Sequence, residues 1–190
     1  MRLKRDPKPA RHGGYQEWAE YLDQWAEGSV PDGSQLLPLY REDFAGETWA
    51  RLADRFTGAI NRRTASWQAA LSRATDAANS DEFAYGRALQ QGRAGMAVVR
   101  QLASDARIPE ELRTALTKLF DNLLRQMQEQ LEDSVQRQRG RGDSARYVEA
   151  RLYTLRSNPL TAVIAQPSAH PAGWTPPAAE DAPRRRIVRP

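Results

Sequence analysis

The sequence has no cysteine, only two histidines and no long apolar run. Without cysteine, the 190-residue chain can form neither a disulfide framework nor a thiolate metal site. No window approaches the roughly 18 consecutive apolar residues of a membrane span, and residues 1–14 lack the apolar segment of a signal peptide. We therefore expect a cytoplasmic protein without a membrane partner.

Residues that carry catalysis or bind metals are also scarce. Both histidines, His12 and His170, lie in segments that we expect to be tails, so neither belongs to a preformed site. The chain has no zinc-protease motif, no Gly-x-Ser-x-Gly elbow and no glycine-rich dinucleotide turn. Adjacent carboxylates such as Glu110 and Glu111 point in different directions on a helix. The sequence therefore predicts no catalytic residue, no cofactor and no metal site, in a protein that is not an enzyme.

Positive charge is concentrated toward the two ends of the chain, whose formal net charge is +4. Residues 1–14 carry five bases and one acid, residues 137–156 carry six arginines and two acids, and residues 157–190 carry four arginines and two acids. The segment that is left, 15–136, therefore has a net charge of −6. An acidic body is not the charge pattern of a folded face that grips nucleic acid, so contact with a polyanion would belong to the basic segments.

The clearest single element is a long amphipathic helix, expected at about 109–139. Pro109 suits the first turn because its missing N–H would have no partner there, and Glu110 and Glu111 suit the positive end of the helix dipole. A helix of this length spans roughly 45 Å, so it needs partner helices of similar length. Its apolar stripe recurs at steps of three or four residues: Leu112, Leu116, Leu119, Leu123, Met127, Leu131 and Val135.

Two further long helices are expected at about 43–78 and 81–107, because apolar side chains again recur at steps of three and four. In the first, Arg63 interrupts the apolar stripe, and we expect its stem to pack while its charged head reaches water. In the second, Gly92 and Gly95 lie among the apolar positions. Such small residues would let another backbone approach closely.

Shorter elements complete the predicted fold. Helices are expected at 15–27 and 144–156, each with one apolar face. Basic and proline-rich composition at the two ends of the chain favours extended conformations there. The predicted fold class is all-α, a bundle of three long helices with a short helix at each end and extended basic or proline-rich termini. The expected domains are a basic arm (1–14), a helical domain (15–156) and a proline-rich tail with a basic end (157–190).

Two tryptophans, Trp18 and Trp25, share the apolar face of the expected N-terminal helix, whose charged side chains are all acidic. This aromatic surface has two interpretations. The helix closes one end of the core, or its aromatic face meets another subunit, since aromatic side chains often anchor interfaces. Under the second interpretation Trp18 and Trp25 are partner-binding residues.

The tail offers three further contact points for an extended segment that lies on a partner. They are the apolar island from Leu160 to Ala165, the single aromatic Trp174 and the arginine cluster Arg184–Arg186. We therefore add Leu160 and Trp174 to the candidate partner-binding residues.

The favoured interpretation is a non-enzymatic structural or adaptor subunit of a larger assembly, which binds neighbouring protein subunits, either copies of itself or other chains. The aromatic helix and the tail present more adhesive surface than a small monomer needs. The alternative is a nucleic-acid-associated protein, such as a coat or small complex subunit, that contacts phosphates through its arginine-rich termini and residues 137–156. The candidate phosphate-binding side chains are Arg2, Arg5, Arg137, Arg139, Arg141, Arg184, Arg185 and Arg186.

Overall fold

The computed structural model describes residues 13–78, 81–140 and 145–165. Every regular element in these ranges is a helix, so the predicted all-α class is confirmed. No helix in these ranges is both long and apolar enough to cross a membrane. The elements in order are α1 (Tyr15–Ala26), the 3-10 helix η1 (Arg41–Asp43), α2 (Gly46–Ala77), α3 (Glu82–Ala103), α4 (Glu110–Gly140), α5 (Ala145–Ser157) and α6 (Ala162–Ala165).

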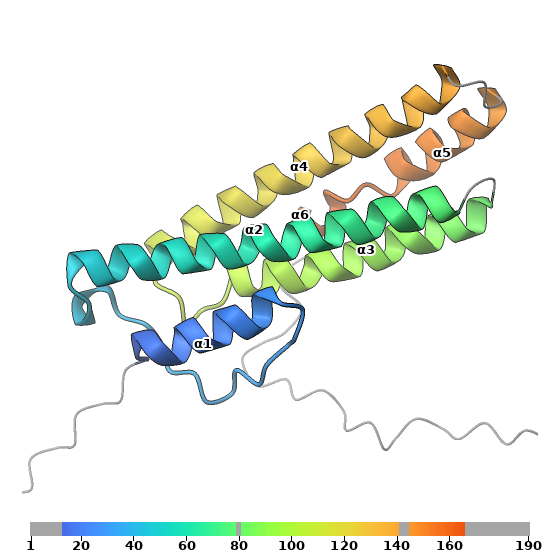
Figure 1. The fold of residues 1–190 in the computed structure, drawn as a ribbon. Helices are drawn as coiled ribbons and strands as arrows, with labels where there is room; N and C mark the ends of the chain where they lie inside the picture. The colour runs from blue at the N-terminus through green and yellow to red at the C-terminus, as the bar shows by residue number, and fades with distance from the viewer. Residues whose placement is uncertain (1–12, 79–80, 141–144, 166–190) are drawn as a thin grey trace, which may run out of the picture.

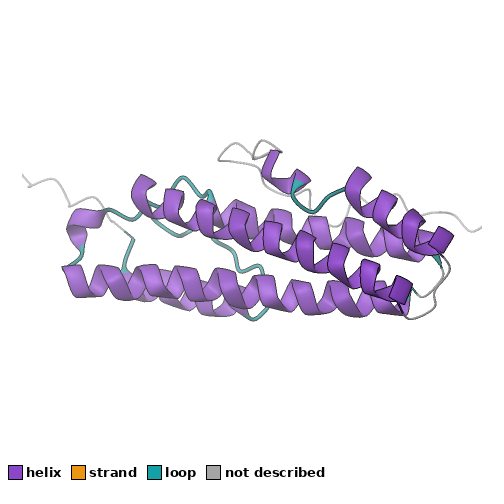
Figure 2. Ribbon diagram, turned by 90° about the horizontal axis from the view of Figure 1, so that it is seen from above, coloured by secondary structure: helices purple, strands orange, loops and turns teal. Residues whose placement is uncertain are grey.

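The long helices α2 and α3 run antiparallel as a closely packed pair (Figure 1). α4 crosses this pair diagonally and rises away from it toward its own C-terminal end (Figures 1 and 2). α5 turns back beside α4 and also contacts α3, while α1 packs against α2 on the opposite side from α4. The chain therefore has three layers, with the α2–α3 pair in the middle.

Local sequence explains where several helices begin and end. The Asp81 carboxylate caps α3 by accepting hydrogen bonds from the amides of Phe83 and Ala84, at 2.9 and 3.0 Å. α4 starts directly after Pro109, whose carbonyl accepts the first helical bond. Gly28 has a φ of 113°, a conformation that favours glycine, and α1 ends just before it.

Two glycines of α3 set how closely α2 and α3 pack. A Cβ atom added to Gly95 would lie 2.3 Å from the Trp67 indole, and one added to Gly92 would lie 3.2 Å from Leu71. The neighbours of these glycines are therefore side chains of α2. The indole of Trp67 takes up the space that Gly95 leaves.

One hydrophobic core runs along the bundle and continues beneath α5 and α6. It holds Trp18 and Trp25 at the α1 end and Val148, Leu155 and Leu160 at the other side. The folded part thus extends past the expected boundary at residue 157. The expected arm at 1–14 lies almost wholly outside the described residues, as does the tail from residue 166.

Candidate functional site

Trp18 and Trp25, the two aromatic candidates for partner binding, both lie in the core of the chain. Their side chains are 0% and 2% exposed. The Trp18 ring packs against Phe56 of α2, with 5.4 Å between ring centroids, and its Nε1 donates to the carbonyl of Leu37 at 3.0 Å. The structure thus has α1 closing one end of the core. Partner contact through either tryptophan stays a prediction, and it requires α1 to leave the bundle.

Arg63 of α2 is buried at the C-terminal end of α1, with 5% of its surface exposed. Its Nη1 donates to the carbonyls of Trp25 and Ser29, at 2.7 and 3.3 Å, and its guanidinium lies 5.3 Å from the centre of the Trp25 ring. Burial lowers the pKa of Arg63. The expectation that its head reaches water is wrong, because the last carbonyls of a helix need donors and attract positive charge.

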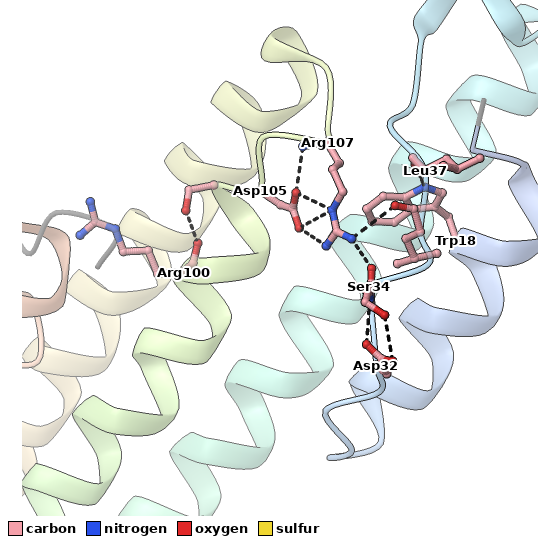
Figure 3. Close-up of polar contacts among 10 residues, drawn as sticks. Trp18, Asp32, Ser34, Leu37, Arg100, Asp105 and Arg107 are labelled. Atoms are coloured by element: carbon pink, nitrogen blue, oxygen red, sulfur yellow. Dashed lines mark hydrogen bonds and ion pairs between the residues drawn. The ribbon is translucent and has the colours of Figure 1, made fainter. Parts of the chain in front are cut away.

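Arg107, in the turn between α3 and α4, holds the long loop that follows α1 (Figure 3). Its guanidinium pairs with Asp105 at 2.6 Å, donates to the Gly33 carbonyl and lies 5.6 Å from the centre of the Trp18 ring. Its own carbonyl accepts from the amide of Leu39 at 2.9 Å. The hydrogen bonds that the Arg107 guanidinium donates to the Asp105 carboxylate raise the pKa of Arg107. One side chain thus ties the loop, α1 and the turn together.

Arg151 connects α5 to the bundle in a similar way. It is 2% exposed, and its guanidinium lies 4.6 Å from the ring centre of Tyr85 in α3 and 4.4 Å from that of Tyr147. Its Nη1 donates to Gln138 of α4 at 3.3 Å. Arg63, Arg107 and Arg151 therefore stabilise contacts between elements of the chain itself, through carbonyls and aromatic rings.

The candidate site is the surface on which residues 158–164 lie. We call these residues the docked segment, and the surface of α3 and α4 beneath them the α3–α4 face. Leu160 and Val163 of the docked segment are 0% and 2% exposed, so both side chains are enclosed by the bundle. The short helix α6 lies against α3 (Figure 1). Leu160, the apolar candidate for partner binding, is therefore covered by its own chain.

Polar side chains of the α3–α4 face bind the backbone of the docked segment. Arg93 donates to the Asn158 carbonyl at 2.8 Å, and Arg100 donates to the Val163 carbonyl. The Oε1 atom of Gln128 in α4 accepts from the Leu160 amide at 2.9 Å, in a buried position. The docked segment is thus held at three points along its backbone.

The side chain of Gln128 is held in orientation by Glu132, which in turn pairs with Arg156. Its Nε2 donates to Oε1 of Glu132 at 2.8 Å, and Oε2 of Glu132 faces Nε of Arg156 at 3.4 Å. Arg156 lies near the end of α5, directly before the docked segment. This network fixes the side-chain oxygen of Gln128 that accepts the Leu160 N–H. Its members lie on α4 and α5 and do not include the docked segment.

A second concave feature lies between α2 and α4, and its volume is about 240 Å³. Arg137 lies at this cleft, and its Nε donates to the Asp133 carbonyl at 3.3 Å. The side chain of Arg139 and the candidate residues Arg2, Arg5, Arg141, Trp174 and Arg184–Arg186 lie outside the described parts of the structure. The cleft is lined by Gln68, Leu71, Ser72, Thr75, Met127, Gln130, Leu131, Ser134 and Arg137.

Sequence reasoning missed the side chains that hold the docked segment, namely Arg93, Arg100 and Gln128. One signal was available. Gln128 lies four residues after Leu124 and three before Leu131, so it occupies a position of the apolar stripe.

Comparisons with known proteins found no matching family model, no matching curated protein and no matching solved structure.

Proposed function

We propose that the protein is a non-enzymatic structural or adaptor subunit whose helical body binds protein segments on the α3–α4 face. The contacts of the docked segment carry this proposal. Two apolar side chains, Leu160 and Val163, are enclosed, and the backbone is held by side-chain donors and an acceptor. Peptide-binding domains that hold an extended segment use the same two kinds of contact: hydrogen bonds to the peptide backbone give affinity, and pockets for its side chains give specificity.

The docked segment depends on the face for its order. α6 has four residues, far fewer than the roughly 12–15 that an isolated helix needs. Burial of Leu160 and Val163 contributes about 3–6 kcal/mol, and the three hydrogen bonds, two of them from arginine, contribute about 4–7 kcal/mol. Ordering the backbone of the segment costs about 7–14 kcal/mol. These free energies nearly cancel, so the segment can leave the face and another can replace it.

A labelled peptide of residues 157–165 tests the proposal on the full-length chain. Leu160→Asp in the chain should empty the α3–α4 face, because the carboxylate cannot be buried there unpaired. Fluorescence anisotropy should then show the peptide binding to the Leu160→Asp chain at least about tenfold more tightly than to the wild type, whose face is already occupied. Circular dichroism should show that the helices of the variant are kept. If they are lost, Leu160→Ala takes its place.

Two control peptides make the result specific to the contacts described. A peptide with Leu160→Asp should not bind, whereas one with Asn158→Ala should bind like the original, because Arg93 binds the backbone carbonyl of Asn158, which alanine keeps. Adding Arg100→Ala and Gln128→Ala to the chain should weaken binding at least about tenfold. Absence of peptide binding to both emptied chains would overturn the proposal.

Phosphate contact through the arginine-rich segments stays a prediction. Of its candidate side chains only Arg137 is described, at the edge of the α2–α4 cleft. Binding of this kind should weaken by orders of magnitude between about 50 and 200 mM salt. A gel-shift titration with a labelled oligonucleotide at the two salt concentrations measures it.

A further inference from the structure

The docked segment is separable from the helix that precedes it. α5 is held by contacts of its own, which include Arg151 against Tyr85 and Arg156 against Glu132. Pro159 then interrupts the helical path, because a residue before proline is disfavoured in the α conformation. The docked segment can therefore leave the α3–α4 face while α5 keeps its place.

We infer that the docked segment of one copy occupies the α3–α4 face of a second copy, so that two chains exchange residues 158–164. This inference rests on the proposed function and identifies its partner. The fit is already visible, because the occupant of the face is this same sequence with Leu160 and Val163 enclosed. Every copy carries both the segment and the face. Exchange therefore needs no contact that the single chain does not already make.

Geometry favours a closed pair of chains. The docked segment begins directly after α5, which ends at Ser157, so little chain is left to span a gap and the two α3–α4 faces must lie close together. A two-fold arrangement satisfies this for both segments at once and leaves no free segment for further growth. It also brings together the C-terminal ends of the two α5 helices, near Tyr153, a large aromatic side chain that is 74% exposed in the single chain.

The test uses two full-length variants, each of which lacks one half of the contact. The Leu160→Asp chain keeps its face but has no usable segment, and the Arg100→Ala/Gln128→Ala chain keeps its segment but has a weakened face. Light scattering after size exclusion, from about 1 to 500 μM protein, should show a concentration-dependent dimer for the wild type. Each variant alone should dimerise at least about tenfold more weakly.

Mixing the two variants should restore a dimer, because the intact segment of one can occupy the intact face of the other. The matched control is Arg87→Ala, an exposed arginine of the same helix as Arg100, which should dimerise like the wild type. A wild type that stays monomeric throughout the range, a dimer that Leu160→Asp leaves unchanged, or a mixture that stays monomeric would each overturn the exchange. The proposed function would survive any of these if the labelled peptide still binds the emptied face.

Discussion

Tyr85 shows how one buried hydroxyl makes stability depend on pH. Its side chain is 1% exposed, and its hydroxyl has no hydrogen-bond partner within the described ranges. Burial raises the pKa of Tyr85 from its ordinary 10.0 to about 12, although the nearby Arg151 acts in the opposite direction. The folded chain therefore keeps the phenol proton at pH values at which the unfolded chain has lost it.

The free energy of unfolding should accordingly fall as pH rises from about 10 to 12. The contribution of Tyr85 is fully present below pH 10, and up to about 3 kcal/mol is lost across this window. Tyr85→Phe should remove that part of the decline, and at neutral pH it should be neutral or stabilising by about 1 kcal/mol, because no hydrogen bond is broken. Urea denaturation of both proteins at several pH values measures the difference. Identical profiles for Tyr85→Phe and wild type would refute the assignment.

Gly95 and Gly86 form a matched pair within α3. Alanine at Gly95 would drive its Cβ into the Trp67 indole, whereas a Cβ at Gly86 meets nothing within 4 Å. We expect Gly95→Ala to destabilise the chain by about 1–3 kcal/mol through overpacking. Gly86→Ala should stabilise it by up to about 1 kcal/mol through helix propensity. Thermal unfolding of the two variants should shift in opposite directions, and a stabilised Gly95→Ala would show that Trp67 can move aside.

Residue patterns along the chain predict apolar burial better than polar burial. Leu116, Met127 and Val135 follow from helical periodicity and are buried. The burial of Arg63 and Arg151 does not follow from periodicity, because an arginine is buried only where carbonyls or aromatic rings contact its guanidinium. Those contacts depend on how helices that are distant in the sequence cross. Periodicity along one helix contains no information on that crossing.

Among the larger elements, the loop between α1 and η1 depends on one residue of a distant turn. Arg107→Ala removes the donor to Gly33 and the pairing with Asp105, so the loop should open without unfolding of the bundle. We expect the Leu39 amide, which is bonded to the Arg107 carbonyl, to exchange its hydrogen at least about tenfold faster, with a loss of about 1–3 kcal/mol in local stability.

Hydrogen exchange measured by mass spectrometry can separate this local opening from global unfolding. Amides in the centre of α3, around Met96, should keep their protection. The control is Arg51→Ala, because the Arg51–Glu47 pair is exposed (68% and 78% for the two side chains) and should contribute less than about 1 kcal/mol. Equal acceleration in the loop and in α3 would mean that the loop does not open independently.

For whole elements, the sequence predicts the positions of helices well, but it predicts poorly which segments of the chain pack against them. Pro109, two acids and a regular stripe identify α4 to within a residue or two at each end. The proline-rich composition of residues 157–190 and their distance from the other apolar stripes predict a segment that extends onto a partner. The docked segment returns to the bundle because Gln128 binds the backbone of Leu160 and the arginines of α3 bind the carbonyls of Asn158 and Val163. Glutamine and arginine are ordinary solvent-facing residue types in a sequence.

For the whole molecule, arginine chemistry predicts a stability that changes little with salt. The ion pairs recorded for the described residues lie mostly near the surface, and such pairs contribute about 0–1 kcal/mol each and are screened by salt. The buried Arg63 binds the carbonyl of Trp25, and the guanidinium of the buried Arg151 lies over the Tyr147 ring. Raising NaCl from about 0.05 to 0.5 M should therefore change the free energy of unfolding by less than about 2 kcal/mol.

Urea denaturation at the two salt concentrations tests this expectation on the full-length chain. The same titration separates the body from the basic ends, because phosphate binding through arginine should weaken steeply over the range in which folding stability stays flat. Exchange of the docked segment should also persist in salt, since Leu160 and Val163 are apolar and salt screens only interactions between charges. A dimer that dissociates as salt rises would instead point to contacts between charged ends, and stability that falls with salt would show that ion pairs hold the helices together.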